Sequence, residues 1–152
     1  MIIFVMRHGE AEPYKQDDPS RHLTRFGITQ CEHAAKWITK QLQEQSKQQQ
    51  LDLCLVSPYV RTLETLTALE SGLSIANTSK TALLTPIGEA SAVQDLIDGS
   101  FMYDSKIKSL LIVSHMPLVS LLSDTLCKGF NARIFDTADV LMIDYDEVRS
   151  QG

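Results

Sequence analysis

Residues 2–9 of the chain, IIFVMRHG, decide the fold class. Residues 2–6 form a short, continuously apolar run, which is typical of a strand buried on both faces of a sheet. The run ends abruptly in Arg7, His8 and Gly9. The first predicted strand therefore carries charged and titratable side chains at its carboxyl end.

Strand-like and helix-like segments alternate along the rest of the chain. The further strands that we expect are 51–56, 83–85, 110–113 and, near an edge of the sheet, 140–145. The expected helices begin after Thr24 and after Ser57, and two more span 90–97 and 118–126. This alternation predicts an α/β fold, a three-layer sandwich with a mainly parallel sheet. No repeat or linker divides residues 1–152, so we expect a single domain.

Two helix starts have recognisable capping residues. Thr24 is the expected N-cap of the first helix, whose apolar positions recur at helical spacing from Cys31 to Leu42. Ser57 is the expected N-cap of the second helix, with Pro58 at its first helical position. The Gln-rich stretch 41–50 is interpreted as a solvated, fraying helix end; a role in binding a partner is the less favoured alternative.

Composition limits the classes of function. The net charge of −5 argues against binding to nucleic acid, which needs a basic face. No apolar run approaches the roughly 20 residues that cross a bilayer, and the N-terminal segment lacks the basic start of a signal peptide. The three cysteines are unevenly spaced, and we expect buried free thiols in a reducing cytoplasm.

Polar residues follow three predicted strands. They occur in 7–9 (RHG), 57–61 (SPYVR) and 114–117 (SHMP). In an open parallel sheet, binding sites form outside the carboxyl ends of the strands. A side chain in the first turn of a helix tilts back toward that edge, so Arg61 should point to it as well. We therefore expect Arg7, His8, Arg61 and His115 to share one pocket.

Such a pocket fits a phosphoryl group. Arginine keeps its proton, and its planar fork matches phosphate oxygens. A neutral histidine can attack phosphorus, while the remaining positive charges stabilise the equatorial oxygens of the transition state. Gly9 would allow the phosphate a close approach. Taken singly these residues have simpler interpretations, since His115 could be a hydrogen-bonded cap and Arg61 could pair with Glu64 or Glu10.

Together the motifs make the chain resemble the histidine phosphatase superfamily, which has the phosphoglycerate mutase-like fold. The resemblance rests on residues 6–10 (MRHGE), 23–24 (LT) with Gly27 and Gln30, 57–62 (SPYVRT) with Thr65, and 113–117 (VSHMP). Within the superfamily the chain is most similar to the small SixA-type phosphohistidine phosphatases. The narrower likeness rests on residues 21–24 (RHLT), on 84–86 (LTP) with Gly88 and Glu89, and on the short length.

The resemblance implies a role for each matching residue. His8 would be the nucleophile that becomes a transient phosphohistidine, and Arg7, Arg61 and His115 would bind the phosphoryl group. Arg21 matches a basic position of the SixA-type pattern and would assist in binding. The implied partner is a phosphohistidine-bearing phosphocarrier or phosphorelay protein, with no cofactor and no metal.

The chain departs from larger members of the superfamily, which carry a long insertion that caps the site and a carboxylic acid that protonates the leaving group. Here the corresponding stretch is short, and Glu89 is the nearest carboxylate. A protonated imidazole leaves phosphorus without help from such an acid, whereas an alkoxide needs one. The missing cap and acid thus favour phosphohistidine on a protein as substrate. The alternatives are a small-molecule phosphomonoesterase and a non-catalytic module that binds phosphoproteins.

Several residues receive a structural interpretation instead. We expect His22 and His33 on solvated or partly buried faces, and Trp37 and Phe26 packed on the first helix. Two arginines in the pocket argue against a bound cation there. The pair 17–18 (DD) is expected in a solvated loop that could border the site, and Glu10 or Glu12 could pair with one of its arginines.

Overall fold

The computed structural model describes residues 1–131 and 134–152. The strands are β1 (Ile2–Arg7), β2 (Leu51–Val56), β3 (Ile75–Lys80), β4 (Ser109–Ser114) and β5 (Val140–Asp144). The α-helices are α1 (Arg25–Ser46), α2 (Val60–Leu69), α3 (Ala90–Tyr103) and α4 (Leu118–Leu126). Two short 3₁₀ turns are η1 (Asp18–Ser20) and η2 (Ala82–Leu84).

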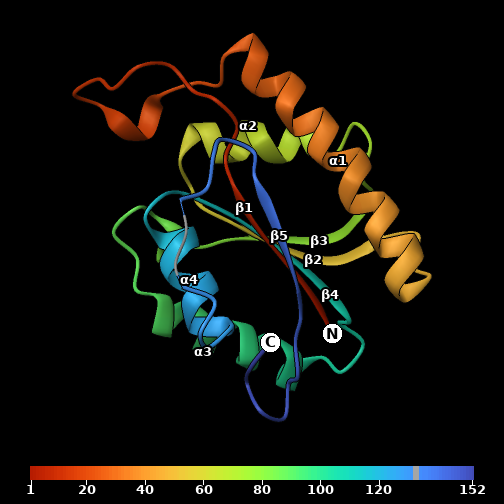
Figure 1. Ribbon diagram of the computed structural model, residues 1–152. Helices are drawn as coiled ribbons and strands as arrows, with labels where there is room; N and C mark the ends of the chain where they lie inside the picture. Colours follow the sequence, from red (N-terminus) through yellow and green to blue (C-terminus); the bar gives the residue numbers. More distant parts are fainter. Residues whose placement is uncertain (132–133) are drawn as a thin grey trace.

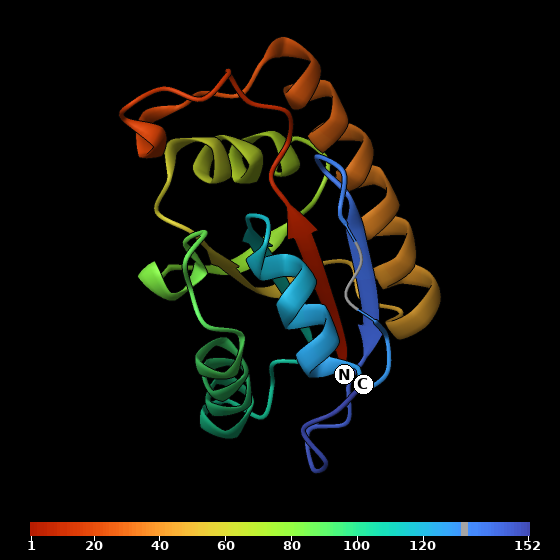
Figure 2. The same cartoon turned by 60° about the vertical axis from the view of Figure 1, so that its left-hand side comes forward.

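The strands form one sheet in the order β3-β2-β4-β1-β5. All neighbouring pairs are parallel except β1 and β5, which are antiparallel. Helices α1 and α2 cover one face of the sheet, and α3 and α4 cover the other (Figures 1 and 2). The predicted three-layer α/β sandwich with a mainly parallel sheet is therefore confirmed.

The apolar run of β1 supplies both cores, because successive side chains point to opposite faces of a strand. Phe4 and Met6 lie in the core beneath α1 and α2. Ile3 and Val5 lie in the core beneath α3 and α4. All four are fully buried, and each contributes roughly 1.5–3 kcal/mol by leaving water. This double burial is the reason that the run is apolar without alternation.

The edges of the sheet depart most from the prediction. The structure has an additional strand, β3, whose residues after Ile75 are exposed. The sequence did not predict this strand because, apart from Ile75, which packs against a core, its residues are polar and exposed at the edge of the sheet. Strand β5 lies at the opposite edge, as expected for 140–145.

Two local predictions are wrong, and one helix is longer than expected. Residues 83–85 form no strand, because the chain turns through η2 to bury Leu84. The N-cap of α2 is Tyr59 and not Ser57. Helix α3 continues beyond Ile97 to Tyr103, since Phe101 extends its buried face by one turn. The N-cap of α1 is Thr24, which accepts a hydrogen bond from the Gly27 N–H, as predicted.

The thiols of Cys31, Cys54 and Cys127 are free; the first two are buried and the third is partly buried. Burial raises the pKa of Cys54 to about 12. Within residues 1–131 and 134–152 no helix is long and apolar enough to cross a membrane.

Candidate active site

The carboxyl ends of β1, β2 and β4 are held level with one another by two backbone hydrogen bonds. The His8 N–H donates to the Ser114 carbonyl at 3.0 Å, and the Ser57 N–H donates to the Val113 carbonyl at 3.1 Å. These bonds continue the parallel ladder one residue past the strands. The three polar junctions thus begin at one height above the sheet.

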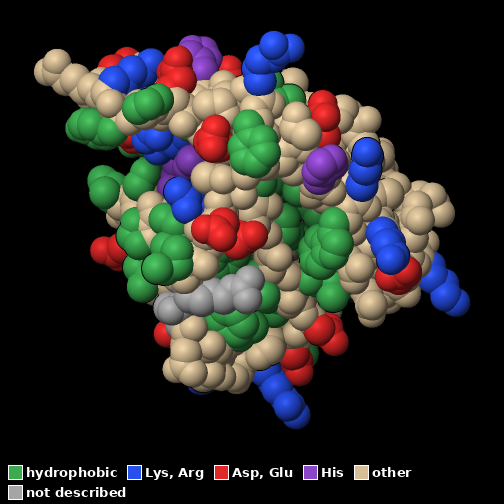
Figure 3. All heavy atoms as spheres, turned by 45° about the horizontal axis from the view of Figure 1, so that its top comes forward, with side chains coloured by type: hydrophobic (Ala, Val, Ile, Leu, Met, Phe, Trp, Pro, Cys, Tyr) green, Lys and Arg blue, Asp and Glu red, His purple; other side chains and the backbone are tan. Residues whose placement is uncertain are grey.

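A cavity of about 320 Å³ lies above these strand ends. Its lining residues are Arg7, His8, Tyr14, Asp18, Arg21, Arg61, Pro86, His115 and Met116. Figure 3 shows basic and histidine side chains gathered in a hollow at this end of the molecule, with hydrophobic side chains beside them. The five residues predicted for phosphoryl binding, other than Gly9, therefore face a single cavity.

The His8 ring has its tautomer set by its two partners. Its Nδ1 lies 2.7 Å from the Gly9 carbonyl oxygen, which can only accept a hydrogen bond. Its Nε2 lies 3.1 Å from the Arg61 Nε–H, which can only donate. The proton is therefore on Nδ1, and the lone pair is on Nε2. The nitrogen available to attack an electrophile is Nε2.

Both histidines of the cavity are neutral at physiological pH. Burial, with the positive charge of Arg61 and Arg7, lowers the pKa of His8 to about 4, although its bond to Gly9 opposes the shift. Burial and the nearby His8 lower the pKa of His115 to about 2. Their ring centroids are 5.1 Å apart. The cavity therefore holds fixed positive charge on arginine and a neutral imidazole with an unprotonated Nε2.

Arg61 is nearly fully buried, with 3% of its surface exposed, and Asp18 is its counter-ion. Its Nη2 lies 3.1 Å from the Asp18 carboxylate, and its Nη1 donates to the Asp18 carbonyl at 2.8 Å. The other carboxylate oxygen lies 2.8 Å from Arg21 Nη1. Asp18 thus bridges two arginines that line the cavity. The partner of Arg61 is not Glu64 or Glu10, since both carboxylates have other partners.

The pKa of Asp18 reflects this bridge. Burial alone would raise it, but the hydrogen bonds and positive charges of Arg21 and Arg61 outweigh burial and lower it. Burial lowers the pKa of Arg61, and Asp18 opposes that shift. Among the described residues that line the cavity, Asp18 is the only acid, and it is ionised.

Arg7 and His115 are anchored from outside the cavity. Arg7 Nη1 donates to the Phe135 carbonyl at 2.7 Å, and the His115 Nε2 lies 2.8 Å from the Ser57 hydroxyl. The Tyr59 ring packs edge-on to His115 and lies 5.0 Å from the guanidinium carbon of Arg61. Arg7 Nε and His115 Nδ1 are buried and have no hydrogen-bond partner within the described part of the chain.

Gly9 is required by the packing of its loop on α1. A Cβ atom there would lie 2.6 Å from the Gly27 carbonyl oxygen and 2.7 Å from Cys31 Sγ. A Cβ atom at Gly27 would in turn collide with the Glu10 backbone. The Gly9 N–H donates to the Thr65 hydroxyl at 3.1 Å. Gly9 does not line the cavity, and its role in admitting a phosphate stays a prediction.

The sequence predicted that the loop with Asp18 could border the site, but it did not reveal that Asp18 bridges two arginines or that Tyr14 lines the cavity. Both lie in the polar loop after β1, and the only signal was the spacing of three residues between Asp18 and Arg21 within a turn opened by Pro19. Glu89 caps the start of α3 and does not line the cavity. His22 is exposed and binds the Glu64 carboxylate at 2.6 Å, as expected for a solvated residue.

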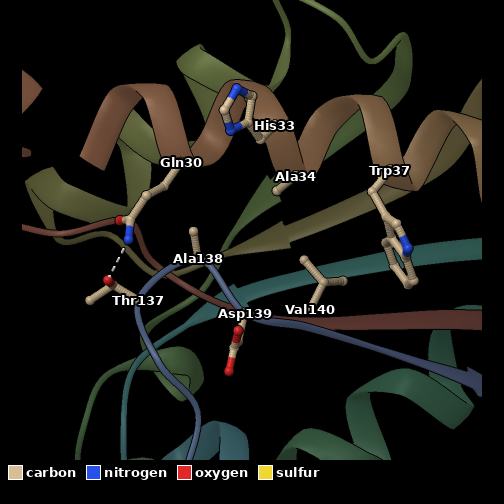
Figure 4. Close-up of a pocket in the computed structure, with 8 residues that line it drawn as sticks. All are labelled: Gln30, His33, Ala34, Trp37, Thr137, Ala138, Asp139 and Val140. Carbon is tan, nitrogen blue, oxygen red and sulfur yellow. Dashed lines mark hydrogen bonds between the residues drawn. The ribbon is translucent and has the colours of Figure 1, made fainter. Parts of the chain in front are cut away.

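A second cavity of about 350 Å³ lies between α1 and residues 137–140. Figure 4 shows Gln30 and Trp37 reaching from the helix toward Thr137 and Val140, with a hydrogen bond from the Gln30 amide to the Thr137 hydroxyl. No arginine or lysine is among its lining residues in the described chain. Although slightly larger, this groove does not suit a phosphoryl group.

Within the described residues there is no cluster of three or more His, Cys, Asp or Glu side chains that could hold a metal ion.

Comparison with known proteins gives two close likenesses in sequence. The chain is 36% identical to the phosphohistidine phosphatase SixA homolog of Haemophilus influenzae, over 99% of this chain and 92% of that protein. It is 30% identical to phosphohistidine phosphatase SixA of Escherichia coli, over 97% and 87% of the two chains. No protein-family model matches the chain.

Solved structures give the same result. The protein histidine phosphatase SixA, solved as a complex with tungstate, superposes with a TM-score of 0.88 and 29% identity, covering 99% of this chain and 92% of the other. A phosphohistidine phosphatase SixA described for Agrobacterium tumefaciens has a TM-score of 0.75 at 17% identity, covering 96% and 92% of the chains, and shares the fold.

Proposed function

This chain belongs to the histidine phosphatase superfamily, among its SixA-type members, and we propose that it hydrolyses phosphohistidine on a protein through a phospho-His8 intermediate. The observation that carries the proposal is the neutral His8 ring, whose Nε2 lone pair faces a cavity lined by three arginines. The sequence relatives are both named as phosphohistidine phosphatases. The tungstate bound by the SixA structure is a tetrahedral oxyanion like phosphate.

In the first step, the His8 Nε2 lone pair forms a bond to phosphorus while the bond from phosphorus to the substrate's imidazole breaks. The imidazole takes that electron pair. If its other nitrogen already carries a proton, it leaves as a neutral ring and needs no acid. His8 becomes a phosphorylated imidazolium, and its Nδ1–H remains bonded to the Gly9 carbonyl, which stabilises the new positive charge.

In the second step, water attacks phosphorus and the bond to His8 Nε2 breaks. The electron pair returns to Nε2, inorganic phosphate is released, and the proton lost by water passes to phosphate and solvent. Arg7, Arg21 and Arg61 would bind the phosphoryl oxygens in both steps, and the unpartnered Arg7 Nε and His115 Nδ1 would add hydrogen bonds. Positioned donors are expected to supply most of the rate enhancement.

The lack of a protonated acid supports phosphohistidine as the substrate class. Asp18 is ionised and held between Arg21 and Arg61, so it is a poor proton donor. Glu89 lies outside the cavity. An alkoxide leaving group needs a proton from a positioned acid, and the described residues of the cavity offer none, whereas an imidazole that already carries a proton needs no acid. The small-molecule phosphomonoesterase is therefore the less favoured function.

The experiment that tests the proposal compares three substrates: phosphoramidate, a chemically phosphorylated histidine phosphocarrier protein, and a panel of phosphate monoesters. We expect hydrolysis of the two compounds with a phosphorus–nitrogen bond and little hydrolysis of the monoesters. His8→Asn should abolish turnover, and brief reaction of the wild type should trap acid-labile phosphate on His8. Hydrolysis by His8→Asn at the wild-type rate would refute the mechanism. Phosphoprotein binding without turnover would instead identify a binding module.

We also propose a domain organisation and a cellular location for the chain. We take residues 1–152 as one histidine-phosphatase domain, since both cores are built on the single sheet. The three free thiols support a reducing, cytoplasmic location.

A further inference from the structure

The mouth of the cavity is bordered by apolar side chains. Tyr14, Pro86 and Met116 line the cavity together with its charged residues. Ile87, next to Pro86, is 90% exposed, and Tyr14 is 79% exposed. We call these four residues the apolar rim. Figure 3 shows hydrophobic surface beside the basic hollow.

Ile87 is exposed on a loop that is firmly held. Leu84 is fully buried, and its carbonyl accepts a hydrogen bond from the Ser114 hydroxyl at 2.8 Å. The loop closes through the Gly88 N–H, which donates to the Thr85 carbonyl at 2.9 Å. A Cβ atom at Gly88 would collide with the Leu83 backbone, so the loop is closely packed. Ile87 is thus presented to solvent by a fixed structure and not by a loose segment.

Exposure alone does not mark a binding surface, since single apolar residues are common on protein surfaces. Met102, Tyr103 and Val148 are 87%, 95% and 88% exposed, and they lie far from the cavity, beyond the amino ends of the parallel strands. The apolar rim differs because Tyr14, Pro86 and Met116 line the cavity that holds the reactive His8, and Ile87 adjoins Pro86. His8 is 6% exposed, so a phosphoryl donor must enter the cavity to reach it.

Because a histidine side chain is short, a protein that delivers its phosphohistidine to His8 must contact the apolar rim. Histidine has only two rotatable bonds between backbone and ring, so a phosphohistidine can reach His8 only if the partner's backbone comes down to the cavity mouth. The partner's neighbouring side chains then lie on the apolar rim. Apolar anchors placed centrally in an interface and ringed by polar groups contribute most of the binding energy. A small phosphorylated molecule would gain nothing from Ile87.

We propose that the apolar rim is the docking surface for the substrate protein, and that this protein presents its phosphohistidine among apolar side chains. The proposal rests on the proposed function and adds to it the surface that distinguishes a protein substrate from a small one. The arginines then recognise the phosphoryl group, and the rim recognises the surface that carries it.

The test measures kcat/KM for two substrates. One is phosphoramidate, and the other is a histidine phosphocarrier protein that has been phosphorylated with phosphoramidate. The variant is Ile87→Asp, and the matched control is Val148→Asp, which changes an equally exposed residue far from the cavity. We expect Ile87→Asp to lower kcat/KM for the phosphoprotein about ten- to hundredfold and to leave phosphoramidate hydrolysis unchanged. Val148→Asp should change neither rate.

Each other outcome decides against the proposal. Equal losses on both substrates would place Ile87 in the phosphoryl site, and no loss on the phosphoprotein would mean that the rim is not a docking surface. A wild type that hydrolyses phosphoramidate but not the phosphoprotein would also overturn it. If Ile87→Asp instead converts a dimer to a monomer in sedimentation, with unchanged phosphoprotein kinetics, the rim is a contact between copies. A wild type inactive on both substrates would refute the proposed function itself.

Discussion

Two cavities of similar volume differ in what their side chains can do. Residues 137–140 line the groove beside α1, and backbone hydrogen bonds tie this segment to the end of β1. The Ala138 N–H donates to the His8 carbonyl at 3.0 Å, and the Arg7 N–H donates to the Asp139 carbonyl at 3.1 Å. The cavity of about 320 Å³ holds three arginines and a neutral histidine, whereas the groove of about 350 Å³ holds none of these arginines.

The difference teaches that charge and unsatisfied hydrogen-bonding groups, not volume, distinguish the reactive cavity. In the groove, Gln30 is fully engaged: its oxygen accepts from the Glu10 N–H at 2.9 Å and its amide donates to Thr137 at 3.0 Å. It therefore joins the loop after His8 to residues 137–140 of the groove. The groove supports the site, and the cavity performs the chemistry.

Among substitutions in the two cavities, the largest loss of activity is expected at Arg61. Arg61→Lys keeps the charge but loses the planar fork that contacts both His8 and Asp18. We expect kcat/KM for phosphoramidate to fall about hundredfold or more, comparable to losing one transition-state donor. Arg25→Lys, at an exposed arginine of α1, is the matched control. A loss below about threefold would remove Arg61 from the phosphoryl site.

Asp18 should have the next largest effect. Asp18→Asn removes the charge that holds Arg21 and Arg61 in one geometry, and we expect kcat to fall about tenfold because orientation of the donors is lost. The control is Asp17→Asn, at the exposed neighbour. If Asp18→Asn raised the activity, the carboxylate would be competing with the phosphoryl group for the arginines instead of positioning them.

The burial of His8 in the cavity should make the stability of the fold depend on pH. His8 has a pKa of about 4 in the folded protein against 6.5 in the unfolded chain, so the unfolded chain binds the proton more readily. Stability is therefore complete above about pH 6.5 and falls as the pH drops toward 4. We expect His8→Asn to flatten the fall in the urea-derived free energy of unfolding across this window relative to the wild type. A slope in His8→Asn equal to that of the wild type would show that burial of His8 does not shift its titration.

The smallest effects are expected in the groove. Gln30→Ala should destabilise the fold by about 1 kcal/mol, since it leaves the Glu10 N–H and Thr137 without their partner. His33→Ala should change the free energy of unfolding by no more than about 0.5 kcal/mol, as for an ordinary surface substitution. It should change kcat/KM by no more than about twofold. Thermal unfolding and phosphoramidate kinetics measure both. A large kinetic loss in His33→Ala would make the groove a second functional site.

Much of the site could be predicted because its residues stand at the ends of buried strands. Arg7, His8 and His115 follow runs whose burial on both faces is evident from the sequence, and Arg61 follows a third such run. Asp18 and Tyr14 could not be placed in the same way, since they lie in an irregular polar loop. Only the contacts of that loop with Arg21 and Arg61 decide where its side chains point.

The sequence by itself predicted the α/β class, the layered arrangement around a sheet and the arginines and histidines at its carboxyl edge, because hydrophobic periodicity and the succession of strands and helices along the chain are local properties. The tertiary structure alone decided the tautomer of His8, the ionised bridge of Asp18 and the reason for Gly9. It also decided that Ile87, next to the cavity-lining Pro86, is exposed to solvent. These features depend on distances between residues far apart in the chain, which burial and hydrogen bonding set only once the layers have packed.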